Sequence, residues 1–292
     1  MTGQRADAER DDLYAKFLEN KKIPIPDRQR AAYDAASDYL KRYDHGDDEH
    51  AAELRKFVRE YQRVMKDFQV YELYAEKKYL KAFEIGRPII EKDPENFYVL
   101  AVLTQVGFDN SQTGNTSLND ETAGYARRAL DLLEADKPAK FDPFASKETG
   151  RGFLNFALGW FLRTQAPTEA ASALVVAARS EGPYKSNALT YNLLGNALLK
   201  DYAKSSAEYN EKYGNKPPSE EQQAELAKIM QLGERAIDAY ARAVALTTKP
   251  EEQEGRTKML AQLTSLYKSF HNNSDAGLAE LIAGILSKPL PG

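Results

Sequence analysis

The stretch "LNFALGWFLRTQAPTEAASALVVAARSEGP" (residues 154–183) decides the fold. It is apolar and rich in helix-forming residues, yet it places Gly159 directly before Trp160, the only tryptophan of the chain. A glycine inside a helix costs about 1 kcal/mol relative to alanine, so its missing side chain must serve a purpose. We expect a second helix to pack closely against Gly159, because a larger side chain would hold the two backbones apart.

The same combination of leucine, glycine and small residues recurs along the chain. The quoted stretch reads Asn155-x2-Leu158-Gly159-x2-Leu162, then Ala171-x3-Val175, Ala178 and Pro183. A second phrase places its glycine 36 residues after Gly159 and reads Tyr191-x2-Leu194-Gly195-x2-Leu198. This pattern resembles the tetratricopeptide repeat, a helix–turn–helix of 34 residues. That repeat has W-x2-L-G-x2-Y in its first helix, A-x3-F in its second and a closing proline.

The resemblance covers most of residues 60–270 and implies an all-α fold: an irregular, tetratricopeptide-like solenoid of helix hairpins with inserted loops. Weaker echoes of the repeat are Tyr79, Ala82 and Pro94 on one side, and Ala236, Tyr240 and Ala243 on the other. Inserts at 109–119 and 208–222 interrupt the period. The stretch 269–289 is similar to that of bacterial tetratricopeptide proteins that usually carry an export signal, and no activity is attached to that likeness.

Hydrophobic periodicity predicts helices along almost the whole chain, and the short connections between them favour antiparallel hairpins. We divide the chain into an N-terminal helical cap region (1–60), a repeat array (61–274) and a C-terminal capping helix with a tail (275–292). The predicted helices span residues 7–20, 27–43, 48–77, 79–91, 97–108, 120–134, 147–164, 168–179, 186–202, 220–246, 254–270 and 275–287.

The composition excludes several classes of protein. The 292 residues carry a net charge of −4 with both signs interspersed, so the chain lacks the basic footprint of a nucleic-acid-binding protein. The absence of cysteine excludes disulfides, thiolate metal sites and a cysteine nucleophile. No apolar run approaches the ~18 residues of a membrane span, and the polar start lacks the apolar core of a secretory signal. We expect a cytoplasmic protein, or a periplasmic or secreted one if Met1 replaces a removed signal peptide.

Two segments resemble metal sites, and we interpret both as helix boundaries. In "YDHGDDEH" (43–50), the spacing of His45 and His50 is not that of a helical His-x3-His pair. Gly46 is expected to end one helix, and the acidic run to favour the positive end of the next helix dipole. The segment "DNSQTGNTSLND" (109–120) has the length of a calcium loop but lacks charged ligands at its third and fifth positions. We therefore predict no metal and no cofactor.

Motifs for catalysis are also missing. The stretch 146–152 has two glycines and basic residues, but it does not follow the order of a phosphate-binding loop, and no strand precedes it. No nucleophile lies in a strained turn motif. We predict no catalytic residue and do not expect an enzyme.

One constellation points to partner binding. In a tetratricopeptide array the first helix of each hairpin lines a concave groove, and Phe153, Phe156, Trp160 and Arg163 form one stripe at helical spacing. Tryptophan and arginine are enriched at binding hot spots. For the two phenylalanines, packing in the core is an open alternative. The predicted partner-binding residues are Tyr98, Gln105, Phe108, Phe153, Phe156, Trp160, Arg163, Asn192, Asn196 and Lys200.

These observations favour a non-enzymatic helical repeat scaffold that binds a protein or peptide in its concave groove. The lysine, asparagine and arginine pattern of the family's carboxylate clamp is not reproduced, which argues against a receptor for chaperone C-termini. The alternative is a structural subunit that self-assembles, or packs into a larger complex, through the ends of its helical array.

Overall fold

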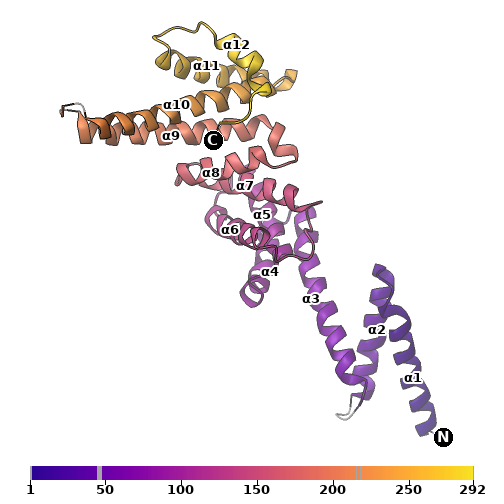
Figure 1. Ribbon diagram of the computed structural model, residues 1–292. Helices are drawn as coiled ribbons and strands as arrows, with labels where there is room; N and C mark the ends of the chain where they lie inside the picture. Colours follow the sequence, from indigo (N-terminus) through magenta and orange to yellow (C-terminus); the bar gives the residue numbers. More distant parts are fainter. Residues whose placement is uncertain (1, 45–47, 215, 218, 292) are drawn as a thin grey trace. The chain divides into compact units, whose positions relative to one another are not determined.

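The computed structural model describes residues 2–44, 48–214, 216–217 and 219–291 (Figure 1). Every regular element in these ranges is a helix, which confirms the predicted all-α class. The chain divides into two compact units, Met1–Lys78 and Tyr79–Gly292. The predicted division at residues 60 and 61 therefore falls inside a helix, α3 (Ala51–Ala75). Within the described ranges, no helix has both the length and the apolar character needed to cross a membrane.

The first unit packs three helices around a small core. Helix α1 (Thr2–Lys21) and α2 (Pro26–Tyr43) form a hairpin, and α3 completes the unit. Pro26 suits the first turn of α2, where its fixed φ fits the helix and its missing N–H is not needed. The core consists of three large side chains and three alanines of α2: Phe17, Tyr39, Leu54, Ala32, Ala35 and Ala36.

The second unit contains the remaining helices, and consecutive helices from α4 to α11 pack against one another, whereas α12 packs against α10. Three hairpins form its centre: α5 with α6, α7 with α8, and α9 with α10. The first helices of these hairpins also touch, α5 with α7 and α7 with α9. The bounds are α4 Tyr79–Lys92, α5 Phe97–Gln112, α6 Asn119–Glu134, α7 Lys147–Leu162, α8 Pro167–Arg179, η1 Pro183–Ser186, α9 Ala188–Tyr213, α10 Glu220–Leu246, η2 Pro250–Glu252, α11 Gln253–Phe270, α12 Leu278–Gly284 and η3 Ile285–Ser287.

Side-chain caps fix where several of these helices begin. Asn96, Asn187 and Ser219 each accept a hydrogen bond from a backbone N–H in the first turn of α5, α9 and α10. Ser146 and Thr149 form a reciprocal capping box at the start of α7. Each cap satisfies a donor that would otherwise lack an intrahelical partner, so the boundaries follow from local sequence.

The glycine in the middle of α7 has the role that the sequence predicts. A Cβ atom built on Gly159 would lie 2.4 Å from Cγ of Leu174 on α8, so only glycine allows this approach. Leu174, rather than the neighbouring alanines of the repeat pattern, fills the space. A Cβ on Gly195 of α9 would likewise lie 2.9 Å from the ring of Tyr240 on α10. All three central hairpins share this feature, because Gly107 of α5 contacts Thr122 of α6 in the same way.

Both predicted inserts are partly helical. Helix α5 continues to Gln112, and α9 continues to Tyr213 instead of ending near residue 202. The α9/α10 hairpin is longer than predicted because polar contacts hold its far end. There, the Tyr213 hydroxyl lies 3.0 Å from Glu221 Oε1 and 2.9 Å from Glu225 Oε2, and Lys212 pairs with both carboxylates.

Candidate binding face of α5, α7 and α9

Five aromatic side chains connect α5, α7 and the turn η1. The ring of Phe108 on α5 meets three rings of α7 edge to face, with centroid distances of 6.0 Å to Phe153, 5.5 Å to Phe156 and 5.6 Å to Trp160. Tyr184 of η1 stacks on Phe156 at 4.7 Å. Phe108, Phe153 and Phe156 are buried, so their rings form the contact between neighbouring hairpins. The alternatives for Phe153 and Phe156 are an exposed position in a groove and packing in the core, and the structure has both packed in the core.

Trp160 and Arg163 lie at the edge of this cluster and are half-buried. The indole Nε1 of Trp160 donates a hydrogen bond to Ser111 Oγ at 3.0 Å, which fixes the ring. The Arg163 guanidinium lies over the indole, 4.1 Å from the ring centroid, and donates to the carbonyl oxygen of Trp160. The exposed Lys200 of α9 donates to the carbonyl oxygen of Arg163 at 3.0 Å. The two side chains are therefore held as a stacked pair.

The electrostatics of Arg163 are unusual for a surface arginine. Burial lowers the pKa of its guanidinium from the ordinary value. Among the described residues no carboxylate forms an ion pair with it. Because arginine stays protonated in proteins, this half-buried guanidinium can still donate hydrogen bonds to an acidic or carbonyl group of a partner.

The remaining predicted residues are divided between the face and the interior. Tyr98 and Gln105 are half-buried on α5. Asn196 turns toward the inside of its hairpin, where its Oδ1 accepts a hydrogen bond from the Tyr240 hydroxyl at 3.0 Å. Gln262 of α11 donates to the same Tyr240 oxygen at 2.7 Å. The half-buried Asn192 contributes its backbone oxygen to Asn196. The structure thus brings Trp160, Arg163 and Lys200 together, whereas the Asn196 side chain bonds within its own helix and to Tyr240.

Sequence analysis missed two residues of this site. Ser111 falls in the segment 109–120, which we interpret from the sequence as a helix boundary, yet it is buried in the last turn of α5 and orients the indole. Tyr184 directly follows the closing Pro183, and burial raises the pKa of its hydroxyl to about 12. Ser111 could have been predicted from its spacing: it lies one turn beyond Phe108 and therefore continues the same helical face.

The segments considered as metal sites have other contacts. Asp48 accepts hydrogen bonds from the backbone N–H groups of His50 and Ala51, at 2.8 and 3.2 Å, and thereby begins α3. The ring of His50 stacks on Tyr14. His45 and Gly46 lie outside the described residues. Where the chain is described, no group of three or more histidine, aspartate or glutamate side chains could hold a metal ion.

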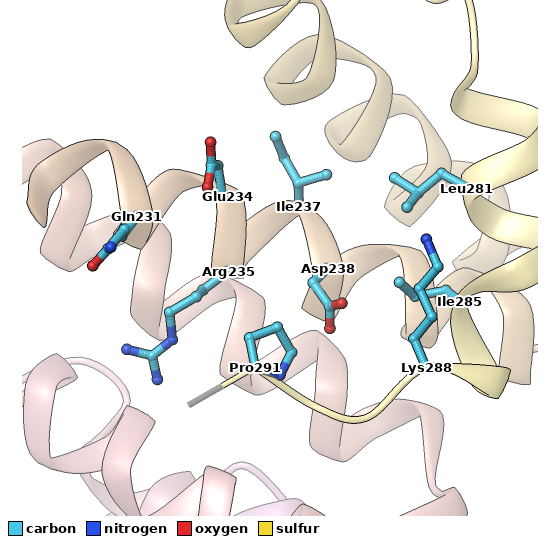
Figure 2. Close-up of a pocket in the computed structure, with 9 residues that line it drawn as sticks. All are labelled: Gln231, Glu234, Arg235, Ile237, Asp238, Leu281, Ile285, Lys288 and Pro291. Carbon is cyan, nitrogen blue, oxygen red and sulfur yellow. The ribbon is translucent and has the colours of Figure 1, made fainter. Parts of the chain in front are cut away.

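A cavity of about 460 Å³ lies at a different place, between α10, α12 and the segment that follows α12 (Figure 2). Its lining combines two cations, Arg235 and Lys288, with two anions, Glu234 and Asp238. The charges balance, so the cavity has no preference for ligands of one sign. Pro291 forms part of its wall.

Comparisons of the chain with protein-family profiles, with curated proteins and with solved structures give no significant match.

Proposed function

We propose that this protein is a non-enzymatic helical repeat scaffold that binds a protein or an extended peptide along α5, α7 and α9. A tetratricopeptide-like solenoid is part of the proposal. The glycines at 107, 159 and 195 support it, since each allows the first helix of a hairpin to approach the second closely. The contacts of α7 with both α5 and α9 would align three such helices as one binding surface.

The observation that carries the proposal is the stacked pair of Trp160 and Arg163. Both residue types are enriched at binding hot spots. Ser111 holds the indole, and the indole and the carbonyl oxygen of Trp160 hold the guanidinium, so binding would cost little further ordering of these side chains. The complementary group on the partner is an acidic side chain or a carbonyl oxygen for Arg163, next to an apolar residue that covers the indole.

Arg163→Ala provides the test because it removes the cation and leaves the buried rings in place. The intact chain and this variant are used as baits in parallel pull-downs, and bound proteins are quantified by mass spectrometry. Lys258→Ala is the matched control, since Lys258 is exposed on α11 and pairs only with Glu254 among the described residues. We expect proteins captured by the wild type and the control to be reduced about tenfold or more with Arg163→Ala, as for a hot-spot residue.

Equal capture by all three baits would contradict the proposed face. Sedimentation of the purified chain addresses the alternative of a structural subunit. A concentration-dependent assembly that is unchanged in Arg163→Ala, together with no captured partner, would favour self-association through the helical ends.

A further inference from the structure

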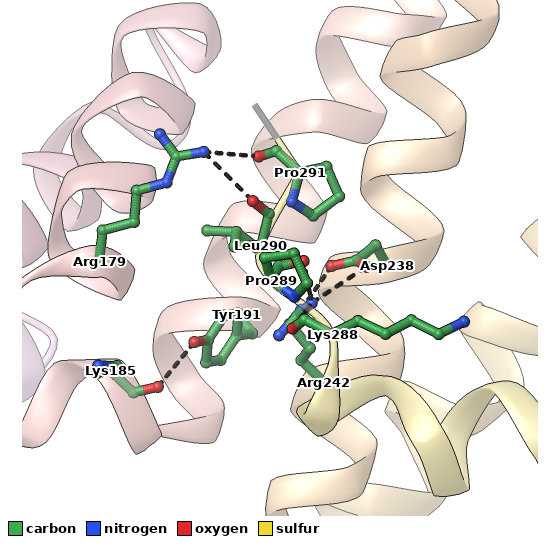
Figure 3. Close-up of polar contacts among 9 residues, drawn as sticks. All are labelled: Arg179, Lys185, Tyr191, Asp238, Arg242, Lys288, Pro289, Leu290 and Pro291. Atoms are coloured by element: carbon green, nitrogen blue, oxygen red, sulfur yellow. Dashed lines mark hydrogen bonds and ion pairs between the residues drawn. The ribbon is translucent and has the colours of Figure 1, made fainter.

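Residues 288–291, with the sequence Lys-Pro-Leu-Pro, run across α8, α9 and α10 without forming a helix (Figure 3). All four carbonyl oxygens accept hydrogen bonds from two arginines. Arg242 Nη2 lies 2.9 Å from the oxygens of both Lys288 and Pro289. Arg179 Nη2 lies 3.0 Å from the oxygen of Pro291 and 3.4 Å from that of Leu290. The segment is therefore held mainly by its backbone.

The alternation of proline suits this arginine-lined groove. Proline has no backbone N–H, so Pro289 and Pro291 present only acceptors. The guanidinium groups of Arg179 and Arg242 can only donate. If both prolines were replaced by residues that have a backbone N–H, two further donors would lie next to the donors of the two arginines. Proline also restricts the free segment to extended conformations, which lowers the entropy lost on binding.

One side chain of the segment reaches into the helices. Leu290 packs against a buried cluster with one residue from each helix: Ala178 of α8, Tyr191 of α9 and Ala243 of α10. The two alanines leave room for the leucine. The Tyr191 hydroxyl donates to the carbonyl oxygen of Lys185 at 2.7 Å, which fixes its ring as one wall of the pocket.

Contacts within the helices also position the side chains that line this groove. Arg242 is almost fully buried, and Asp238 one turn earlier on α10 accepts from its Nε at 2.6 Å. Its guanidinium also lies 6.0 Å from the Tyr191 ring. A buried cation requires hydrogen-bond acceptors beyond one carboxylate, and the segment supplies them as main-chain oxygens. Any extended peptide carries the same oxygens.

We propose that the groove between α8, α9 and α10 is a binding site for an extended Pro-Leu-Pro-type segment of a partner protein, and that residues 288–291 occupy it as an intramolecular competitor. The bound segment shows what such a ligand would supply. Its carbonyl oxygens accept hydrogen bonds from the two arginines, and its leucine lies between two prolines. Because the competitor is tethered, its effective concentration is on the order of millimolar, so a partner must displace it. The proposal uses none of the residues of the α5, α7 and α9 face and does not depend on that function.

The test uses a fluorescent synthetic peptide, Ser-Lys-Pro-Leu-Pro-Gly, and the full chain in two forms. In the second form the segment is replaced by Lys288→Gly, Pro289→Ser, Leu290→Gly and Pro291→Ser. We expect the peptide to bind this opened chain about tenfold more tightly than the wild type, measured by fluorescence anisotropy. Arg242→Met in the opened chain should abolish binding, while Lys258→Met should not change it. A peptide with aspartate in place of leucine should not bind.

A second measurement leaves the segment intact, in case the opened chain does not keep its helical circular dichroism. Ser287→Cys creates a single labelling position, because the chain has no cysteine. An environment-sensitive dye at this position should change its emission when unlabelled peptide displaces the segment. The proposal is overturned if the folded, opened chain does not bind the peptide or if the dye does not respond. It is also overturned if sedimentation detects a wild-type dimer that the opened chain does not form, since the ligand would then be a second copy.

Discussion

The hairpins α7/α8 and α9/α10 begin with the same leucine–glycine phrase but close around it with different chemistry. On α8 an aliphatic side chain, Leu174, fills the space at Gly159. On α10 the ring of Tyr240 fills the space at Gly195, and its hydroxyl requires hydrogen bonds from Gln262 and to Asn196. The repeated glycine thus specifies how closely two helices approach, whereas the residue that fills the space determines whether the surroundings are apolar or polar.

The corresponding faces of α7 and α9 differ in the same sense. Phe156 and Trp160 belong to an aromatic cluster, whereas the equivalent positions 36 residues later carry Asn192 and Asn196. Helix α7 is therefore stabilised by apolar burial. Helix α9 depends more on a hydrogen-bond network that extends to α11.

The largest expected effect is a difference in stability between one substitution on each of these two faces. Phe156→Ala removes a ring that is 2% exposed and should lower the free energy of unfolding by about 3–5 kcal/mol. Asn192→Ala changes a half-buried residue whose side chain makes at most a weak contact, and it should cost less than about 1 kcal/mol. Urea denaturation followed by circular dichroism measures both. Equal losses would mean that the aromatic and polar faces contribute alike.

An intermediate effect concerns the glycines themselves. Gly159→Ala brings a methyl group to 2.4 Å from Leu174 and should destabilise by about 1–3 kcal/mol. Gly195→Ala should cost less, because the corresponding distance to Tyr240 is 2.9 Å. Gly124→Ala on α6 is the control: nothing lies within 4 Å of its Cβ, so it should stabilise by up to about 1 kcal/mol. A stabilising Gly159→Ala would refute the close contact.

The smallest effect depends on pH and concerns Tyr184 of the aromatic cluster. Burial raises the pKa of Tyr184 to about 12 from an ordinary value of 10.0. Between these values the unfolded chain releases the proton and the folded chain retains it, so the free energy of unfolding falls as pH rises. The stabilisation is complete below pH 10 and is lost above about pH 12. At pH 11 the loss is about 1 kcal/mol.

Comparing wild type with Tyr184→Phe isolates this contribution, because the other tyrosines titrate in both proteins. The stability difference should stay constant up to about pH 9 and then shift against the wild type. A constant difference up to pH 11 would indicate that the Tyr184 hydroxyl reaches solvent.

The sequence predicts the helices well where an apolar stripe accompanies a cap. Ser146 and Asn187 mark the starts of α7 and α9, and Gly159 predicts that a second helix packs closely against it, although it does not identify Leu174 as the neighbour. The extension of α9 to Tyr213 could not be predicted in the same way. Residues 203–213 are largely polar, and the contacts of Lys212 and Tyr213 with glutamates of α10 stabilise them.

The candidate site was predictable in part. Trp160 and Arg163 are adjacent on one helical face, so their proximity follows from spacing. The role of Ser111 depends on which face of α5 meets α7, and that is a tertiary property. Arg242 is harder still, because an arginine among alanines in "AYARAVAL" looks like a solvent-exposed position. Its burial depends on a segment 46 residues further along the chain.

The hydrogen bonds from Arg179 to residues 290 and 291 have a consequence for the order in which the protein forms during synthesis. They connect positions separated by 111 and 112 residues, whereas most helix contacts of the second unit join consecutive helices. Neighbouring hairpins can pair soon after they leave the ribosome, since domains fold from the N-terminus as the chain grows. The groove of α8, α9 and α10, however, remains open until residues 288–291 have been translated. During that interval, a nascent chain would present Arg242 and the Leu290 pocket to chaperones and to other chains.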